Sequence, residues 1–224
     1  MTQSQAFLIL KTGANVFLTG EPGSGKTHMV NQYAAYLRER KIETAITAST
    51  GIAATHIGGM TIHSWSGIGI KAKLDKRDLD KIASSGYIKK RVGRAKILII
   101  DEISMLLPET LLMVDVVCRK IKGNSAPFGG LQIVLVGDFF QLPPVVRYDE
   151  NNSQGSLINE SSPRFAYNSP VWAAADLTVC YLGEQYRQDD VDFLNVLTAI
   201  RCNRFGIRHL SHIEKRKIHQ HSAM

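Results

Sequence analysis

The sequence predicts an α/β fold in which a doubly wound, mostly parallel sheet carries helices on both faces. Five short runs rich in β-branched residues recur without strict polar alternation, as expected for strands buried on both faces. Helix-like stretches lie between these runs, so strand and helix patterns alternate along the chain. The apolar fraction of 44% and the charged fraction of 21% are ordinary for a globular protein.

The predicted elements follow one another in chain order, and no internal repeat interrupts them. The expected strands are NVFLTG (15–20), ETAITAST (43–50), AKILIIDE (95–102), LQIVLVGD (131–138) and LTVCYLGEQ (177–185). The expected helices cover 26–41, 108–122 and 191–201. Turn-forming residues predict loops at IGGMTIHSWSGIG (57–69), GNSAPFGG (123–130) and 148–168. We expect one α/β domain over 1–201 and a basic, His-containing tail over 202–224.

Composition limits the compartment and the partners. The longest apolar runs are far shorter than the roughly 20 residues that span a bilayer, and the N-terminus does not resemble a signal peptide. The expected location is therefore cytoplasmic, or nuclear in a eukaryote, with no secretion and no membrane. The three cysteines are odd in number and lack CxxC spacing, which favours reduced thiols without a role.

The formal net charge of +7 favours a polyanionic partner. The segment 71–96 carries ten basic and three acidic residues, an excess that equals the excess of the whole chain. Two interpretations stay open: a solvated charged helix, or a surface that contacts phosphates.

A GxxxxGK[ST] motif follows the first predicted strand and precedes the first predicted helix. Its residues are Gly20, Glu21, Pro22, Gly23, Ser24, Gly25, Lys26 and Thr27. The glycines let backbone N–H groups approach phosphates, Lys26 places a charge on the β and γ phosphates, and the Thr27 hydroxyl ligates Mg²⁺. Pro22 lacks an N–H and so cannot donate. The context identifies a P-loop NTPase that uses ATP and Mg²⁺.

Two carboxylates end the predicted strand that runs from Ile97 to Glu102. Asp101 is expected to complete the magnesium site, and Glu102 to orient and deprotonate the attacking water. This pair favours hydrolysis over transfer of the phosphoryl group to a second substrate.

Two further side chains are candidates for the phosphoryl-transfer step. Gln141, in GDFFQLPP, suits a γ-phosphate sensor because a neutral amide can bond both the phosphate and the lytic water. Arg187, in GEQYRQ, is the best internal source of a guanidinium that stabilises transition-state charge, although a surface arginine is the alternative.

The segments ASTGIAA (48–54) and GMTIHSW (59–65) combine hydroxyls, glycines, a histidine and a tryptophan. Such residues can hold the phosphates and bases of a single strand. Trp65 alone is more typical of a core.

Taken in order, GEPGSGKT, ASTGIAA, TIHSW, DEISML and GDFFQLPPV resemble the PIF type of superfamily 1 DNA helicases, with RecD-type relatives as neighbours. The resemblance runs from about residue 3 to residue 201. It implies a RecA-like motor domain that hydrolyses ATP, moves 5′ to 3′ on single-stranded DNA and unwinds duplex at junctions. The motifs do not choose among replication, recombination, DNA repair and telomere maintenance.

The resemblance also assigns residues. It implies Gln5 as the glutamine that recognises adenine, Lys26 and Thr27 at phosphate and magnesium, Asp101 and Glu102 as the acidic pair, Gln141 as sensor and Arg187 as a phosphate-contacting arginine. It further implies DNA contacts by Thr50, the neighbouring Gly51 and His63.

The second RecA-like domain of the family is missing from this sequence, so we expect translocation by this chain alone to be impaired. Two alternatives stay open. One is a DNA-associated P-loop ATPase that remodels proteins, against which GDFFQLPP and TIHSW argue. The other is a catalytically inactive remnant that binds nucleotide or DNA.

Overall fold

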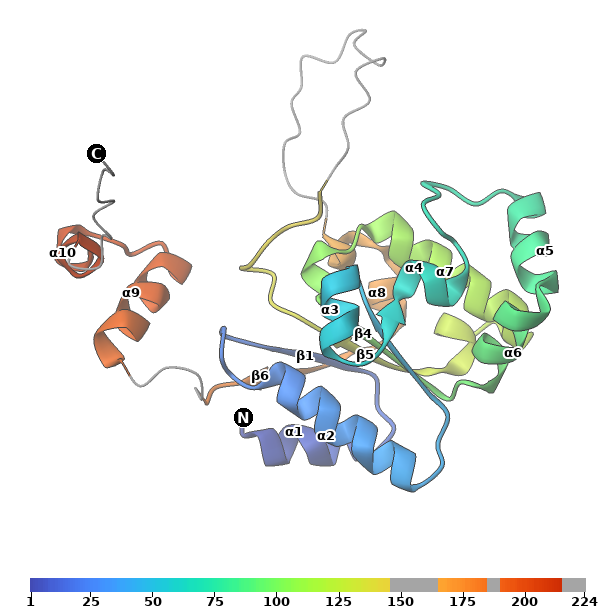
Figure 1. Cartoon of the computed structure of the whole chain (residues 1–224), viewed down its shortest axis with the longest axis horizontal. Helices are drawn as coiled ribbons and strands as arrows, with labels where there is room; N and C mark the ends of the chain where they lie inside the picture. The colour runs from blue at the N-terminus through green and yellow to red at the C-terminus, as the bar shows by residue number, and fades with distance from the viewer. Residues whose placement is uncertain (146–164, 185–189, 215–224) are drawn as a thin grey trace, which may run out of the picture.

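The computed structural model describes residues 1–145, 165–184 and 190–214, and it contains a six-stranded sheet whose paired strands are all parallel (Figure 1). The strands in sheet order are β3 (Met60–Thr61), β2 (Thr44–Ala48), β4 (Ile97–Asp101), β5 (Gln132–Val136), β1 (Val16–Gly20) and β6 (Thr178–Leu182). All five predicted strands are confirmed, and β3 adds a sixth at the edge.

Helices cover both faces of this sheet, as the sequence predicted (Figure 1). They are α1 (Gln3–Lys11), α2 (Lys26–Glu39), α3 (Gly51–His56), α4 (Ile62–Ser66), α5 (Lys76–Ser84), α6 (Gly86–Arg94), α7 (Pro108–Lys122), α8 (Pro170–Ala174), α9 (Val191–Arg201) and α10 (Ile207–Glu214). The three predicted helices correspond to α2, α7 and α9 within two residues. Short 3-10 turns occur at Ile103–Met105, Pro127–Gly130 and Ala166–Asn168.

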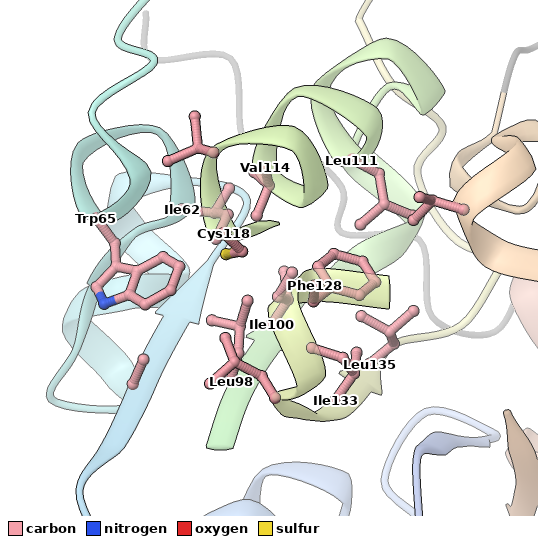
Figure 2. Packing of buried hydrophobic residues seen from close by; sticks show 14 of the residues in the cluster. Ile62, Trp65, Leu98, Ile100, Leu111, Val114, Cys118, Phe128, Ile133 and Leu135 are labelled. Carbon is pink, nitrogen blue, oxygen red and sulfur yellow. The ribbon is translucent and has the colours of Figure 1, made fainter. Parts of the chain in front are cut away.

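Alternate residues of the central strands point into two separate hydrophobic clusters. Ile97 and Ile99 of β4 pack with α1 and α2, whereas Leu98 and Ile100 pack on the other face with α4 to α8. Figure 2 shows the second cluster, with Phe128 and the α7 residues Leu111, Val114 and Cys118 above the sheet. Because both faces are buried, these strands need apolar residues at every position. This is why they appear in the sequence as continuous apolar runs.

The loop predicted at 57–69 is partly wrong, because it contains β3 and α4. The Thr61 side chain accepts a hydrogen bond from Ser64 N at 3.2 Å and so caps α4. Ile62 and Trp65 of α4 are buried, with Trp65 only 4% exposed, which confirms Trp65 as a core residue. A five-residue helix of this kind is stabilised by burial rather than by a long repeat.

The basic segment 71–96 folds into α5 and α6, and the loop predicted at 123–130 ends in a 3-10 turn. The region expected to be the tail contains α10, which lies beside α9 to one side of the sheet (Figure 1). Most of the loop predicted at 148–168 lies outside the described residues. No helix within the described ranges is long and apolar enough to cross a bilayer.

Candidate functional site

The carboxyl ends of the parallel strands meet at one edge of the sheet, where most of the predicted site residues lie. In the strand register Ala48 is level with both Asp101 and Thr61, and Leu18 is level with Val136. The segments that follow β1, β2, β3, β4 and β5 therefore leave the sheet at a common level. In open parallel sheets, this edge is where ligands bind.

The loop 20–27 wraps between β1 and α2 in a conformation that depends on its glycines. Gly23 and Gly25 have φ angles of 87° and 84°, which strain any residue with a Cβ atom. A Cβ atom on Gly20 would lie 2.6 Å from Leu182 O and 2.8 Å from Ser24 Oγ, so a side chain is excluded there as well. The loop ends at Gly25, the N-cap of α2, whose first N–H groups lack partners within the helix.

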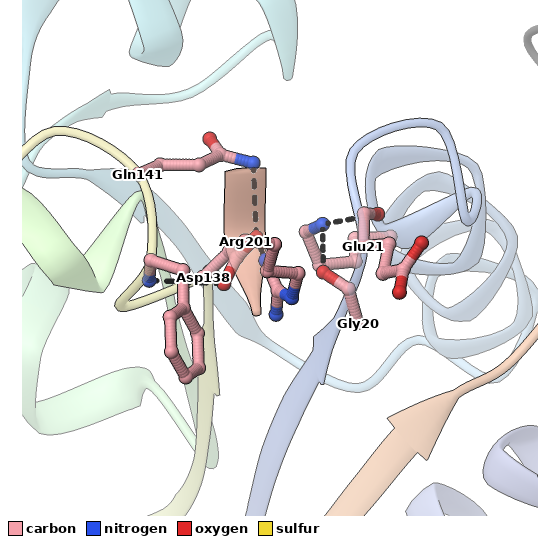
Figure 3. A network of polar contacts seen from close by, with 7 residues as sticks. Gly20, Glu21, Asp138, Gln141 and Arg201 are labelled. Carbon is pink, nitrogen blue, oxygen red and sulfur yellow. Dashed lines mark hydrogen bonds and ion pairs between the residues drawn. The ribbon is translucent and has the colours of Figure 1, made fainter. Parts of the chain in front are cut away.

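Lys26 lies over this loop. Its Nζ donates to Gly20 O at 2.8 Å and to Glu21 O at 3.1 Å (Figure 3). Burial lowers the pKa of Lys26, and Arg201 lowers it further, against the opposing effect of Asp138, Glu102 and Asp101. The ammonium group therefore lies in a partly desolvated place where a bound anion would gain from its charge.

Asp101 and Glu102 occupy the end of β4 and differ in environment. Asp101 is 7% exposed, and burial raises its pKa to about 6, although the bond from Glu102 N to Asp101 Oδ1, 2.9 Å long, and the charge of Lys26 oppose the rise. A cation at this position would favour the ionised carboxylate. Glu102 has φ 53° and ψ 45°, a left-handed conformation that is uncommon for a residue with a side chain. Such strain is typical of functional positions.

Asp138 organises the segment that follows β5 (Figure 3). This carboxylate is 1% exposed and accepts hydrogen bonds from Phe140 N at 3.1 Å, Gln141 Nε2 at 3.3 Å and Arg201 at 2.5 Å. The Arg201 guanidinium also lies 4.4 Å from the centre of the Phe140 ring. Asp138 therefore holds the predicted sensor Gln141 and an arginine from α9 through a single carboxylate.

A cleft of about 550 Å³ lies among these groups, and we call it the nucleotide cleft. It is lined by Pro22, Gly23, Gly25, Lys26, Thr27, His28, Glu102 and Gln141. The structure thus brings together residues that the sequence predicted from three separate strand ends. This volume falls within the range of small-molecule sites.

The residues present fit a nucleoside triphosphate with magnesium. The cleft has the left-handed glycines, the helix N-terminus and the lysine that phosphates require. Thr27 lines the cleft and Asp101 carries its carboxylate at the adjoining strand end, so a hydroxyl and a carboxylate oxygen are available to a hard cation.

The predicted nucleic-acid residues follow the carboxyl ends of β2 and β3, at the same edge of the sheet. Thr50 caps α3 by accepting from Ala53 N at 3.3 Å, Gly51 is exposed at the start of that helix, and His63 lies in α4. The residue before Thr50 bonds directly to the acidic pair: Ser49 N donates to Asp101 O at 3.1 Å, and Ser49 Oγ donates to Glu102 O at 2.9 Å. The two regions are therefore mechanically joined.

A second cavity of about 350 Å³ connects these regions. It is lined by Thr50, Ile52, Ala53, His56, Glu102, Ser104, Met105, Gln141 and Leu142. Ile52 and Leu142, which line this cavity, are 78% and 69% exposed. The cavity places the α3 segment against the residues predicted to act on the γ phosphate.

Known proteins resemble this chain in sequence and in fold. The family model described as PIF1-like helicase matches residues 3–205. The chain belongs to the PIF1-like helicase family. It is 48% identical over 208 residues to the ATP-dependent DNA helicase Pif1 of Psychrobacter sp. (strain PRwf-1), covering 90% of this chain and 30% of that protein. It is 41% identical to the ATP-dependent DNA helicase RRM3 of Saccharomyces cerevisiae, covering 87% of this chain and 26% of that protein.

A solved structure agrees with this assignment. The crystal structure of Bacteroides Pif1 bound to ssDNA matches with a TM-score of 0.81 and 32% identity, over 99% of this chain and 50% of that one. The chain spans about 30% of the length of the curated Psychrobacter relative and about half of the Bacteroides chain. The PIF1-like match confirms the RecA-like P-loop fold predicted from the motifs.

Gln5, to which the PIF-type resemblance gave a role in adenine recognition, does not line the nucleotide cleft. The Gln5 side chain accepts from Thr2 N at 3.0 Å and caps α1, while Gln3 Nε2 donates to Ser24 O at 3.2 Å. Adenine recognition by Gln5 stays a prediction, and Gln3 is the glutamine that contacts the phosphate loop. Arg187 lies outside the described residues.

Sequence reasoning missed Arg201, which the structure of this PIF1-like chain places 13% exposed beside Asp138. No local pattern marks it, because its partner lies 63 residues earlier and a basic residue near the C-terminus of a helix is common. The bond and charge of Asp138 raise the pKa of Arg201 even though burial alone would lower it.

Proposed function

We propose that this chain is the ATP-hydrolysing motor part of a DNA helicase, binding ATP with Mg²⁺ in the nucleotide cleft. One observation carries the proposal: Glu102 and Gln141 line the same cleft as Lys26 and Thr27. A base and a neutral amide facing a phosphate-binding loop suit attack by water on the terminal phosphate.

Each side chain has a distinct part in this proposal. Lys26 binds the β and γ phosphates, and Thr27 and Asp101 hold Mg²⁺, whose charge stabilises the phosphate oxygens when it is bound. Glu102 accepts the proton of the attacking water, and Gln141 orients that water. Gln5 contacts the adenine, and Arg187 supplies charge to the transition state. Gly20, Glu21, Pro22, Gly23, Ser24 and Gly25 shape the loop around the phosphates.

Coupling to DNA follows from the contacts of Ser49. Thr50, Gly51 and His63 are proposed to contact single-stranded DNA, and Ser49 is bonded to both members of the acidic pair. A strand that shifts the α3 segment would therefore shift Glu102, and a phosphate that repositions Glu102 would shift α3. Interactions that differ between two states are what such coupling requires.

The larger activity is also a proposal, because the chain spans only part of its relatives. We propose that residues 1–201 are the first RecA-like domain and that 202–224 lead into a following region. Movement 5′ to 3′ and unwinding of duplex junctions then involve a second RecA-like domain that closes on the cleft.

Magnesium-dependent ATP hydrolysis, measured with and without single-stranded DNA, tests the proposal. We expect hydrolysis that single-stranded DNA stimulates, and we expect Lys26→Ala to reduce it by a factor of about 100 or more, because one preorganised charge has about this value in a transition state. Hydrolysis that survives Lys26→Ala would place the site elsewhere. Stimulation by a protein partner and not by DNA would favour a protein-remodelling ATPase, and nucleotide binding without turnover an inactive remnant.

A further inference from the structure

A groove of about 550 Å³ lies at the opposite edge of the sheet from the nucleotide cleft, and we call it the α6 groove. Its lining includes Glu43 and Thr44 where β2 begins, Gly59 before β3 and Ala95 before β4, so it lies at the amino ends of these strands. β2 and β4 are five residues long, which separates their two ends by about 16 Å at 3.3 Å a residue, whereas β3 has two residues and pairs with Thr47 and Ala48 of β2. The α6 groove is therefore distinct from the nucleotide cleft and from Thr50, which follows the carboxyl end of β2.

One face of α6 supplies the polar wall of this groove. Tyr87, Lys90, Arg91 and Arg94 all line it, at the spacing of three, four and seven residues that puts side chains on one side of a helix. Glu43 is the one acidic residue in the lining. The groove therefore presents three cations and an aromatic ring along one line.

Two of these cations are available to a ligand. Lys90 and Arg94 are exposed, and neither forms an ion pair or hydrogen bond within the described residues. Arg91 is committed: it donates to Ser64 O and, at 2.7 Å, to Trp65 O, and its guanidinium lies 4.7 Å from the centre of the Tyr87 ring.

The acids of the basic segment do not neutralise α6. Asp78 pairs with Lys71 at 2.9 Å, Asp80 pairs with Lys120 at 2.9 Å, and Asp75 caps α5 by accepting from Asp78 N. All three acids belong to α5 or its cap, whereas α6 has no acidic residue. The net positive charge of 71–96 therefore lies mainly on α6 and next to it, and three cations of α6, Lys90, Arg91 and Arg94, line the groove.

We propose that the α6 groove binds a single nucleic-acid strand, with phosphates on Lys90 and Arg94 and an unpaired base on Tyr87. Tyr87 is 69% exposed, which leaves ring surface for a base. This aromatic contact favours a single strand over a duplex, because the base faces of a duplex are already stacked on one another. The site goes beyond the proposed ATPase and does not require hydrolysis.

The groove is also connected to the predicted DNA surface. The carbonyl groups that Arg91 contacts belong to α4, the helix that carries His63. A strand held on α6 would restrain α4 through Arg91, so that one strand could extend from the Thr50 and His63 surface into the groove.

Binding of a fluorescent oligothymidine, followed by anisotropy without nucleotide over a range of salt, tests the site. We expect the double change Lys90→Gln, Arg94→Gln to weaken binding by about tenfold or more. It should also make the slope of log affinity against log salt shallower by about 1.4, the value for two phosphate contacts to a single strand. Tyr87→Ala should weaken binding by about 5-fold or more, as loss of one stacked base does.

The matched control removes two exposed cations from the same segment without entering the groove, as Lys73→Gln, Arg77→Gln. We expect this control to keep most of the salt slope. Equal losses of affinity in both double variants would mean that binding depends on the total charge of the segment and not on the groove, which would overturn the proposal. Equal or better binding of a duplex, insensitive to Tyr87→Ala, would also overturn it.

Photochemical cross-linking keeps this test separate from the proposed ATPase. A strand carrying a photoreactive thymidine should cross-link to the peptide that contains Tyr87, whether or not the chain hydrolyses ATP. Cross-links confined to peptides with Thr50 and His63 would support the proposed DNA contacts of those residues and would overturn the proposal that the α6 groove binds the strand. The melting temperature of each variant is measured first, and only variants that melt at the temperature of the unmodified chain are compared, so that loss of folding is not mistaken for loss of binding.

Discussion

The two edges of the sheet use cations in opposite ways. At the carboxyl edge Lys26 and Arg201 are partly buried, and each is bonded to groups of the protein. At the amino edge Lys90 and Arg94 are exposed and have no partner within the described residues. A desolvated, preorganised charge acts strongly on one bound phosphate, whereas exposed charges act weakly and together on a polyanion. Under the two proposals, the nucleotide cleft binds one phosphate group strongly, and the α6 groove binds a strand through several weaker contacts.

The largest expected effect is the loss of a single carboxylate at the carboxyl edge. We expect Glu102→Gln to lower kcat for ATP hydrolysis by about 10²- to 10⁴-fold, the usual contribution of a general base, while nucleotide affinity is retained. The measurement is steady-state hydrolysis together with binding of a fluorescent nucleotide. Glu39→Gln, an exposed residue whose carboxylate lies 3.8 Å from Arg40, is the control and should leave both quantities unchanged. Parallel losses in the two variants would remove Glu102 from the chemistry.

At the carboxyl edge, features encoded by neighbouring residues could be predicted from the sequence, whereas contacts between residues far apart in the sequence could not. The P-loop and the acidic pair are contiguous motifs attached to strands of mostly apolar residues, so their place at the carboxyl edge followed from the sequence, while their chemistry stays a prediction. The strand order of the sheet, in which β4 lies between β2 and β5, has no local signal. The Asp138 and Arg201 contact joins residues 63 positions apart and was likewise invisible. The α4 helix was missed because five residues show no helical period, although the Thr61 cap was readable.

The second effect concerns the strength of the interaction between Arg201 and Asp138. We expect a double-mutant cycle of Arg201→Gln and Asp138→Asn to give a coupling free energy of about 1 to 3 kcal/mol, because the pair is 13% and 1% exposed and shares a network with Gln141. Amide hydrogen exchange of α9 measures it. Lys71 and Asp78, which are 46% and 26% exposed, form the comparison pair and should couple less strongly, because solvent screens an exposed ion pair. Equal couplings, with that of the second pair measured by exchange in α5, would contradict the expected contrast between a buried and an exposed ion pair.

The third effect tests the backbone beneath the α6 groove. A Cβ atom on Gly59 would lie 2.3 Å from Ile46 O, so Gly59→Ala must displace strand β2 and should lower the free energy of unfolding by about 1 to 3 kcal/mol. Nothing lies within 4 Å of a Cβ atom on Gly93 in α6, and Gly93→Ala should raise the same quantity by about 0.5 to 1 kcal/mol. Urea denaturation distinguishes these signs. Two variants that change stability in the same direction would show that the groove wall is packed differently.

The smallest expected effect is at His63 in α4, the helix to which Arg91 of the α6 groove donates. Burial lowers the pKa of His63 below its ordinary value, so at equal pH the folded protein binds this proton less readily than the unfolded chain. The stabilising contribution is therefore complete above the unfolded pKa of about 6.5 and is lost as pH falls below it. We expect the urea midpoint of the unmodified chain to decline more steeply with falling pH than that of His63→Asn. Parallel declines of the two midpoints would mean that His63 is solvated in the folded protein, so that α4, to which Arg91 donates, does not shield it from water.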